Sequence, residues 1–283
     1  MSRRIWLCAD DYGIAPGVSA AIRDLIAGGR VNATSVMVVA PSFNAEEAAA
    51  LLQINAGKRR AAIGLHLTLT TPFRPLTPAY RPLRDGAFLT LPANFGLAFL
   101  GRLNAASLVA EVETQIAAFQ AAFGRAPDFI DGHQHVHLLL QVRDAVLTAC
   151  ATFAPDAWVR QCGRAPGVPL NLADPKGLVI DWLSRTFSRR AAALGIRTNP
   201  AFAGTYTFSS GADFAGVFPS FLKGLPDGGL IMCHPGFVDD ELRRLDPLTC
   251  LREREHAYLA SDVLPQTLKA AGAALADANA IPT

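Results

Sequence analysis

Residues 5–26 read IWLCADDYGIAPGVSAAIRDLI, an apolar run followed by two aspartates and then by a helical pattern. The run from Ile5 to Ala9 is typical of a buried β-strand. The apolar side chains that follow recur with the 3.6-residue period of an α-helix, at Val18, Ile22, Leu25 and Ile26. A strand followed by an amphipathic helix is one β/α unit, so this stretch predicts a parallel sheet covered by helices.

The same alternation continues along the rest of the chain. Further strands are predicted at Thr34–Ala40, Ala62–Leu69, Phe129–Gly132, Ala157–Arg160, Asn199–Ala203 and Gly229–Cys233. Helices are predicted at Ala45–Leu52, Leu108–Phe119, Leu139–Phe153, Leu178–Leu194, Phe214–Lys223 and Leu264–Leu275. A right-handed series of about seven such units closes naturally into a barrel. We therefore expect an α/β fold, a TIM-like (β/α) barrel in a single domain over residues 1–283, with a doubly wound open sheet as the alternative.

The composition excludes several classes of protein. Hydrophobic residues make up 51% of the chain and charged residues 18%, which allows a large core and argues against disorder. The 26 Lys and Arg residues balance 24 Asp and Glu residues, and no window has the dense basic clustering of a nucleic-acid-binding surface. The short basic groups Lys58–Arg60 and Arg189–Arg190 are typical of solvated helix ends. We expect no nucleic-acid partner.

The lengths of the apolar runs bear on location. None approaches the ~18 residues of a membrane-spanning helix, and the run at residues 5–9 is too short for the apolar part of a signal peptide. The five cysteines are scattered without a CxxC spacing, which favours reduced thiols in the core, Cys8 and Cys233 among them. We therefore expect a cytoplasmic protein without a membrane span.

One segment, Thr71 to Leu91, follows neither a helical nor a strand period. It contains four prolines and several arginines, together with Phe73, Tyr80 and Phe88. Long irregular segments in compact domains are usually functional. We expect a cap loop at about residues 71–91 over the barrel mouth, whose aromatic side chains either stack on a sugar ring or anchor the loop.

Polar side chains stand at or near the ends of four predicted strands. They are Asp10 and Asp11, His66, the group His133, His135 and His137, and finally His234. Five of the six histidines of the chain fall at these positions. The carboxyl ends of parallel strands meet at one face of a barrel, so these side chains are expected to converge there.

Two imidazoles and a carboxylate are a common ligand set for Zn²⁺ and other divalent metals. Such a metal activates water and polarises a carbonyl group, which is the chemistry of hydrolysis. Asp10 and Asp11 alternate in direction along a strand, so one is expected to bind metal and the other to act as a base. The spacing of His133, His135 and His137 would place all three on one face of an extended strand and leaves open which of them is the ligand.

Four motifs together resemble the YdjC family of carbohydrate deacetylases, which includes chitooligosaccharide-active and hopanoid-associated branches. They are ADDYG at 9–13, GLH at 64–66, DGHQHVH at 131–137 and CHPG at 233–236. Their order and approximate spacing match the family over about residues 5 to 240. The resemblance implies a distorted TIM-like barrel related to polysaccharide deacetylases.

The resemblance also implies a role for each residue. One divalent metal ion, Mg²⁺ or Zn²⁺, would be held by Asp11, His66 and His133. Asp10 would be the general base and His234 the general acid. The reaction would remove an acetyl group from an acetylated amino-sugar substrate and release acetate.

Further residues are expected to contact the ligands or the substrate, namely Asp131, His135, His137 and Arg160. Arg160 resembles an arginine that orients the base or a substrate oxygen, and a surface salt bridge is the alternative interpretation. The dipeptide Asp131-Gly132 differs from the Asp-Ser of many chitooligosaccharide-active members, which leaves the exact glycan open.

Two other functions fit some of these residues. A metal-dependent esterase or phosphoesterase on a similar barrel would use the same ligands, and a second metal near Asp131 would favour it. A non-catalytic sugar-binding protein would not need Asp10, Asp11 and His234 together. The sequence leaves the oligomeric state open, a homodimer included.

Overall fold

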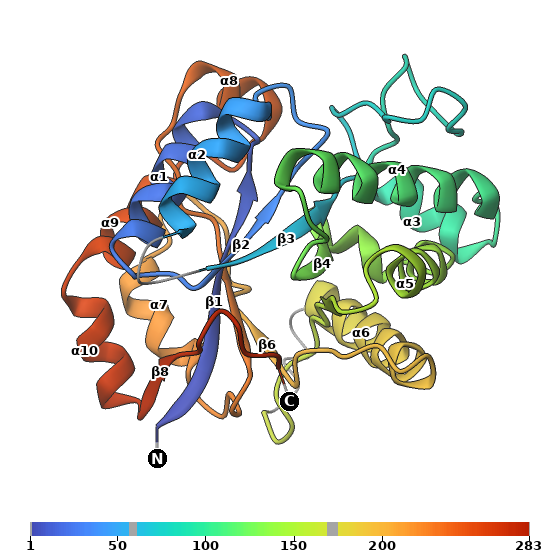
Figure 1. The fold of residues 1–283 in the computed structure, drawn as a ribbon. Coiled ribbons are helices and arrows are strands. Elements are labelled where there is room, and N and C mark those ends of the chain that lie inside the picture. Colours follow the sequence, from blue (N-terminus) through green and yellow to red (C-terminus); the bar gives the residue numbers. More distant parts are fainter. Residues whose placement is uncertain (1, 57–60, 169–174, 283) are drawn as a thin grey trace.

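A computed structural model describes residues 2–56, 61–168 and 175–282 of the chain. Helices surround a central parallel sheet, and the chain passes from sheet to helix and back in the order that the sequence predicts (Figure 1). The basic group Lys58–Arg60 lies outside the described residues, whereas Arg189 and Arg190 are exposed on a helix as predicted.

The strands pair side by side in the order β5-β4-β3-β2-β1-β7-β6, and every pairing is parallel. They span β1 (Arg3–Tyr12), β2 (Ala33–Val36), β3 (Ala62–Leu67), β4 (Phe129–Gly132), β5 (Trp158–Val159), β6 (Phe202–Ala203) and β7 (Leu230–Cys233). The strands follow one another around the ring in chain order, which is the order of a barrel. A doubly wound sheet would instead reverse direction at a switch point.

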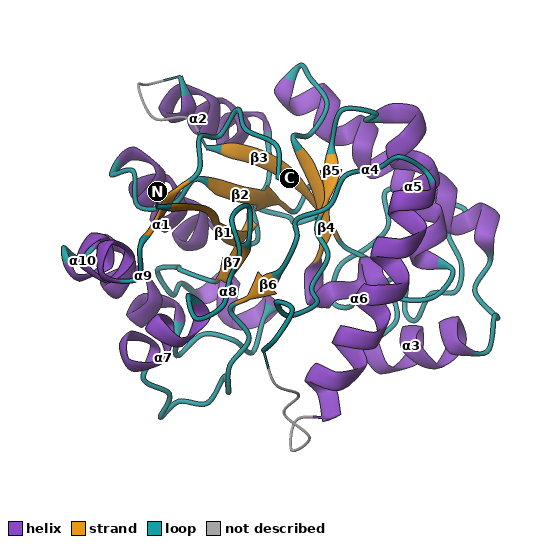
Figure 2. Ribbon diagram, turned by 90° about the horizontal axis from the view of Figure 1, so that it is seen from below, coloured by secondary structure: helices purple, strands orange, loops and turns teal. Residues whose placement is uncertain are grey.

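The ring is completed irregularly between β5 and β6. Val159 forms an isolated parallel bridge with Thr198, and its backbone N–H donates to the carbonyl of Arg197 at 2.9 Å. The N–H of Phe202 donates to the carbonyl of Gly163, also at 2.9 Å. Figure 2 views the molecule from below and shows the strands curving around a common centre, with the helices outside them. The predicted fold class, an α/β distorted barrel, is therefore confirmed.

Most predicted helices are present with shifted ends. The helices are α1 (Pro16–Ala27), α2 (Ala45–Asn55), α3 (Leu91–Phe99), α4 (Ala105–Phe123), α5 (Val142–Phe153), α6 (Pro175–Ala193), α7 (Phe214–Phe221), α8 (Asp240–Leu245), α9 (Arg252–Ala260) and α10 (Val263–Ala270). The prediction of one helix over Leu264–Leu275 is wrong in its last turn. The chain turns at Gly272, where φ is 63°, and continues as β8 (Ala273–Leu275), which pairs with the first residues of β1.

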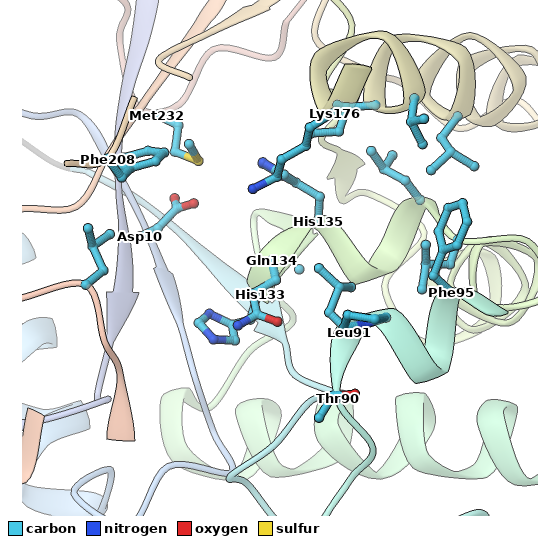
Figure 3. A pocket seen from close by; sticks show the side chains of 18 of the residues that line it. Asp10, Thr90, Leu91, Phe95, His133, Gln134, His135, Lys176, Phe208 and Met232 are labelled. Atoms are coloured by element: carbon cyan, nitrogen blue, oxygen red, sulfur yellow. The ribbon is translucent and has the colours of Figure 1, made fainter. Parts of the chain in front are cut away.

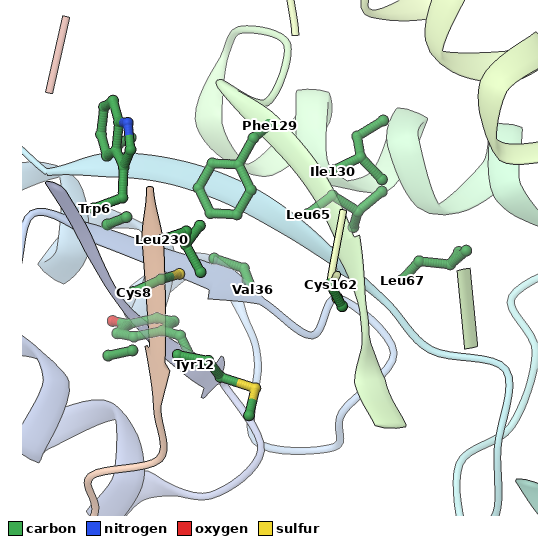
Figure 4. Packing of buried hydrophobic residues seen from close by; sticks show 14 of the residues in the cluster. Trp6, Cys8, Tyr12, Val36, Leu65, Leu67, Phe129, Ile130, Cys162 and Leu230 are labelled. Atoms are coloured by element: carbon green, nitrogen blue, oxygen red, sulfur yellow. The ribbon is translucent and has the colours of Figure 1, made fainter. Parts of the chain in front are cut away.

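Large apolar side chains fill the end of the barrel at which the strands begin. Trp6 of β1 and Trp158 of β5 have ring centroids 5.7 Å apart, and Phe129 of β4 stacks on Trp158 at 4.5 Å. Trp6 and Phe129 are seen among the other buried residues in Figure 4. Gly64 of β3 faces this cluster, because a Cβ at that position would lie 2.5 Å from the ring of Phe129. The core thus closes one end of the barrel and leaves the carboxyl ends of the strands for polar residues.

The irregular segment 71–91 is held against the barrel by its aromatic side chains. Tyr80 and Phe88 are buried and pack edge to face, with ring centroids 5.1 Å apart. Glu111 of α4 accepts hydrogen bonds from the backbone N–H groups of Leu76 and Thr77 at 3.1 and 2.8 Å. Of the two roles considered for these aromatic rings, the structure favours anchoring.

The helices are too short or too polar to cross a bilayer. Among those of the described ranges, none combines the length and the apolar character that a transmembrane span requires.

Candidate active site

A cavity of about 880 Å³ opens at the carboxyl ends of the strands (Figure 3). All five residues expected to carry the chemistry line it, namely Asp10, Asp11, His66, His133 and His234. His135 lines it too, whereas Asp131, His137 and Arg160 lie behind the wall and are buried. The cavity thus brings the sequence-predicted cluster together.

Asp11 is the point at which the two predicted ligand histidines meet. Its Oδ1 lies 3.3 Å from Nε2 of His66 and 3.0 Å from Nδ1 of His133. Strand β1 changes register after Ala9, and Asp11 has a left-handed φ of 70°. This irregularity turns Asp11 away from Asp10, so the two adjacent carboxylates have different partners, as expected. The side chains of Asp11, His66 and His133 converge closely enough to hold one metal ion.

His66 is oriented from behind by a carboxylate. Its Nδ1 lies 2.6 Å from Oδ1 of Asp131 and 2.9 Å from Oγ of Ser35, which leaves Nε2 directed at Asp11. Burial alone would lower the pKa of His66, but Asp131, Asp11 and Asp10 outweigh it and raise this pKa to about 10 in the metal-free chain. A carboxylate on the far nitrogen is the usual way in which proteins orient a metal-binding histidine.

Asp10 is held by a buried arginine. Arg160 donates from Nη1 to Oδ2 of Asp10 at 2.6 Å and from Nη2 to Oδ1 at 2.7 Å, and its Nη2 also lies 2.5 Å from Oδ2 of Asp131. Burial would raise the pKa of Asp10, but the Arg160 guanidinium holds it well below its usual range. Arg160 is fully buried, so its alternative interpretation as a surface salt-bridge residue is wrong.

The three histidines after β4 do not lie on one face of an extended strand, so that expectation was wrong. Residues His133–Leu138 form the short 3-10 helix η1, in which Gln134 and His135 have left-handed φ values of 54° and 59°. The turn sends the side chains in different directions. Nε2 of His137 donates to the carbonyl of Arg160 at 2.9 Å, because a carbonyl oxygen can only accept. Nδ1 of His135 lies 3.4 Å from Sγ of Cys162.

Burial disfavours the charged form of both of these histidines. It lowers the pKa of His137 to about 3 and holds that of His135 well below the ordinary value, with neighbouring positive charges adding to the effect. His137 supports the backbone of Arg160, whereas the ring of His135 packs edge to face against Phe202. Of the three histidines, His133 is the one that reaches Asp11.

His234 follows β7 and is positioned through its backbone. Its N–H donates to Oε2 of Glu255 at 2.6 Å, and the hydroxyl of Tyr206 donates to the other oxygen of Glu255 at 2.6 Å. Phe208 packs edge to face on the imidazole, with ring centroids 5.7 Å apart. Nδ1 of His234 has no hydrogen-bond partner among the described residues. The imidazole is thus held in place by packing and by its backbone.

Sequence reasoning missed two buried charged residues on α9. Nη2 of Arg252 lies 2.7 Å from Oδ2 of Asp11 and 2.8 Å from Oδ2 of Asp246, and Glu255 holds the backbone of His234. Burial raises the pKa of Glu255. One feature of the sequence could have revealed them. Arg252 and Glu255 are three residues apart, which places both on the same helical face as the apolar Leu259. A charged pair on the apolar face of a helix indicates that both side chains are buried.

Two comparisons with known sequences agree on the kind of protein that this chain resembles. The sequence pattern of the family described as YdjC-like protein matches residues 4–270. Chitooligosaccharide deacetylases of Yersinia pestis (strain Pestoides F) and Yersinia pseudotuberculosis serotype O:1b (strain IP 31758) are each 29% identical over 252 residues, which cover 86% of this chain and 85% of the relative.

Two solved structures share the fold. An Enterococcus faecalis V583 protein named for cellobiose-phosphate cleavage superposes with a TM-score of 0.74 at 21% identity, covering 98% of each chain. The lactam utilization protein of Thermus thermophilus superposes with a TM-score of 0.51 at 16% identity, covering 97% of this chain and 99% of the other. At these identities the likeness concerns the barrel alone.

Proposed function

This chain belongs to the YdjC family, and from that premise and its site geometry we propose that it is a metal-dependent hydrolase that deacetylates an N-acetylated amino sugar. The observation that carries the proposal is the convergence of Asp11, His66 and His133 at the cavity wall, beside a separate carboxylate, Asp10. The names of the Yersinia relatives support the reaction and the carbohydrate class. Acetate and a free amine would be the products.

The donor set fits a divalent cation. One carboxylate and two imidazoles would hold it, and Asp131 behind His66 fixes the ring so that Nε2 faces the site. When bound, Zn²⁺ or Mg²⁺ would supply Lewis-acid chemistry, polarising the acyl oxygen and easing the deprotonation of water. Arg252 keeps the remaining oxygen of Asp11 engaged and so limits the directions in which that carboxylate can turn.

Asp10 is suited to take the proton of the attacking water. Arg160 binds both of its oxygens and holds it ionised, so it is ready to accept a proton at neutral pH. The same guanidinium prevents the carboxylate from rotating toward Asp11. Because a depressed pKa makes Asp10 a weak base, the water must itself be made more acidic, which is what the cation would supply.

His234 is placed to protonate the departing nitrogen. It lines the cavity with Asp10 and is held by Glu255 and Phe208, so the imidazole can present a proton without having to be ordered first. An amide nitrogen leaves readily only when it is protonated, so a general acid is required for this reaction.

A phosphoesterase with two metals is the second candidate, and one contact argues against it. Cys8, Asp10 and Asp131 form another group whose ligand atoms converge. However, Nη2 of Arg160 lies 3.0 Å from Sγ of Cys8, donates a hydrogen bond to Asp10 and forms an ion pair with Asp131, so a cation of the protein already fills that position. We infer one metal position.

The test is acetate release by the purified chain. The protein is stripped with a chelator, reconstituted with Zn²⁺ or Mg²⁺, and assayed on N-acetylglucosamine, its oligomers and its simple glycosides, with a phosphomonoester and an acetate ester as comparison substrates. We expect metal-dependent acetate release from at least one amino sugar. Hydrolysis of the phosphomonoester alone would support the alternative, and saturable sugar binding without turnover would support a non-catalytic role.

A further inference from the structure

The side chain of His135 lies on the wall of the catalytic cavity, across the opening from Asp10 and Phe208 (Figure 3). Its imidazole is close enough to Asp10 and His234 for the charges of both to act on it. The ligand set, the base and the acid of the proposed reaction do not include this histidine. Its role in the cavity therefore has to follow from its own contacts.

Two contacts hold the imidazole of His135 in place. Nδ1 lies 3.4 Å from Sγ of Cys162, and the ring of Phe202 packs perpendicular to the imidazole with ring centroids 5.6 Å apart. Cys162 is itself fixed, because its backbone N–H donates to Oγ of the buried Ser184 at 3.0 Å. Nε2 of His135 forms no hydrogen bond with the residues that the structure describes. The ring is thus held from behind and leaves its Nε2 edge to the cavity.

The contact with Cys162 decides which ring nitrogen of His135 carries the proton. An unprotonated imidazole nitrogen is a good acceptor, whereas a thiol sulfur accepts only weakly and its S–H group can donate. Burial raises the pKa of the Cys162 thiol above its ordinary value, so the proton to be donated is present at neutral pH. Sγ of Cys162 has no second partner among the described residues. With the thiol donating to Nδ1, the proton of the neutral imidazole is on Nε2.

The backbone that carries His135 has an unfavourable conformation. Gln134 and His135 are consecutive residues with left-handed φ values of 54° and 59°. Residues other than glycine adopt this conformation only rarely, and such residues cluster at functional sites where their surroundings maintain it. The same turn brings His133 to Asp11 and His135 to the cavity wall. The strained turn therefore presents two imidazoles to the cavity, one of them outside the ligand set.

An Nε2–H group restricts what His135 can bind. A protonated ring nitrogen cannot ligate a metal ion, so its partner has to be a hydrogen-bond acceptor. The carboxylates of Asp10 and Asp11 already have arginine partners. The acetamide oxygen of an amino-sugar substrate would be taken by the cation. The next acceptors in such a substrate are the hydroxyl oxygens on the two carbons that flank the acetamide-bearing carbon.

From this geometry we propose that His135 donates from Nε2 to a sugar hydroxyl oxygen next to the acetamide, and that Cys162 is the positioning residue that keeps the proton on Nε2. The inference rests on the proposed deacetylation and adds a substrate-binding residue to it. His135 contributes to the affinity for the amino sugar and not to the chemical step. Its loss should therefore appear in Kd and KM, with kcat nearly unchanged.

Nitrogen NMR of the imidazole rings in the zinc-loaded chain tests the positioning by Cys162. The two neutral tautomers have different nitrogen shifts, and the signals of His135 are assigned by their absence in His135→Gln. We expect the Nε2–H tautomer in the parent and in Cys162→Ser, whose hydroxyl can also donate, and a shift toward the other tautomer in Cys162→Ala. Cys150→Ala is the matched control, because this buried thiol donates to the carbonyl of Ala154 at 3.6 Å and does not line the cavity.

Calorimetry tests the contact with the substrate. The metal-loaded Asp10→Asn chain is the parent, and it is titrated with N-acetylglucosamine and with its 1-deoxy and 3-deoxy analogues. One of the two deletions should weaken binding by about tenfold, and His135→Leu should weaken binding of N-acetylglucosamine by a similar factor. In His135→Leu the same deletion should change Kd by less than about twofold, because the hydroxyl has already lost its donor. His135→Gln, whose amide can still donate, should recover most of the affinity.

Acetate release separates affinity from chemistry. With Asp10 intact, His135→Leu should raise KM by about tenfold, keep kcat within about threefold and leave the metal content unchanged. Cys162→Ala should raise KM by a smaller factor, and Cys162→Ser should restore it. A merely structural role of Cys162 would not link the KM of these variants to the tautomer of His135.

The outcomes separate the inference from the function on which it rests. An Nδ1–H tautomer in the parent, a tautomer unchanged in Cys162→Ala, or hydroxyl deletions that cost the parent no more affinity than they cost His135→Leu would each overturn the inference, even if acetate is released. A loss confined to kcat would also overturn it, because His135 would then act on the reacting acetamide. The expected tautomers and affinities without acetate release from any amino sugar would instead contradict the deacetylation and leave the role of His135 standing.

Discussion

Asp10 and Asp11 are adjacent in the chain, yet they belong to two different regions of the active site. Asp10 faces the β4 and β5 side, where Arg160 binds both of its oxygens. Asp11 faces the histidines and α9, where His66, His133 and Arg252 surround it. Both carboxylates are buried, and both have a pKa below the usual range.

The difference lies in what surrounds the negative charge. Arg160 binds both oxygens of Asp10, whereas Arg252 binds only Oδ2 of Asp11, whose Oδ1 lies beside the imidazoles of His66 and His133. The arrangement around Asp11 is therefore the one in which a carboxylate oxygen and two imidazole nitrogens converge closely enough for a metal ion. Two neighbouring residues have different partners because the left-handed backbone at Asp11 redirects the strand.

The largest expected effect is loss of the metal from the Asp11 side. His66→Ala and His133→Ala each remove one of three ligands, so the purified variants should contain little bound metal by elemental analysis, and acetate release should fall to background. His256→Ala is the control, since that histidine is outside the cavity and pairs with Asp24. Full metal occupancy in either ligand variant would refute the ligand set.

The next largest effect on acetate release is expected from a change at Asp10, and this change should leave metal binding unaltered. Asp10→Asn retains the size of the side chain but cannot accept a proton, so acetate release should drop by about two orders of magnitude or more while the metal content stays at the parent level. Asp262→Asn makes the same change at an 89% exposed side chain and should alter neither quantity. Unchanged turnover in Asp10→Asn would rule out its role as base.

A smaller effect is expected when Arg160, the cation next to Asp10, is replaced by a cation that binds Asp10 less firmly. Arg160→Lys cannot bind both oxygens of Asp10 and reach Asp131 together. The pKa of Asp10 should therefore rise, and the acidic limb of the kcat/KM profile should move to higher pH. Arg125→Lys is the control, because it changes a comparable arginine that binds both oxygens of Asp128 away from the cavity. An acidic limb that stays in place would show that Asp10 does not control it.

The smallest effect concerns the stability of the metal-free chain. The folded-state pKa of His66 is about 10, above its ordinary value of ~6.5. The stability that this contributes is fully present below the ordinary value and is lost as pH rises toward the folded value. The Tm of the chelated protein should therefore fall by at least a few degrees between about pH 6.5 and pH 10. A Tm that rises through this interval would contradict the interpretation of the His66–Asp131–Asp11 contacts.

Much of the fold could be predicted because its signal is local. The apolar run at Ile5–Ala9 and the Phe129–Gly132 run are buried on all sides, so they appear in the sequence as short uninterrupted strands. Parallel strands place their ends together, and the positions of Asp10, His66 and His234 followed from that rule alone. The prediction of a converging cluster needed no knowledge of distant contacts.

The missed features depend on contacts between distant segments. The left-handed Gln134 and His135 are not marked by glycine, so spacing suggested a strand where the chain turns. Arg252 and Glu255 belong to a charged stretch that resembles an exposed helix. In the folded chain both are buried, because Arg252 pairs with Asp11 and Glu255 accepts a hydrogen bond from the backbone of His234. β8 is short and pairs with β1 from the other end of the sequence.

The central claim is that Asp11, His66 and His133 hold one catalytic metal ion while Asp10 stays paired with Arg160. Titrating Zn²⁺ or Mg²⁺ into the chelated chain, with metal content and acetate release followed together, tests it most directly. The account predicts that activity rises from background and levels off at one bound ion per chain. Full activity in the metal-free chain, or activity that appears only after a second ion binds, would contradict it.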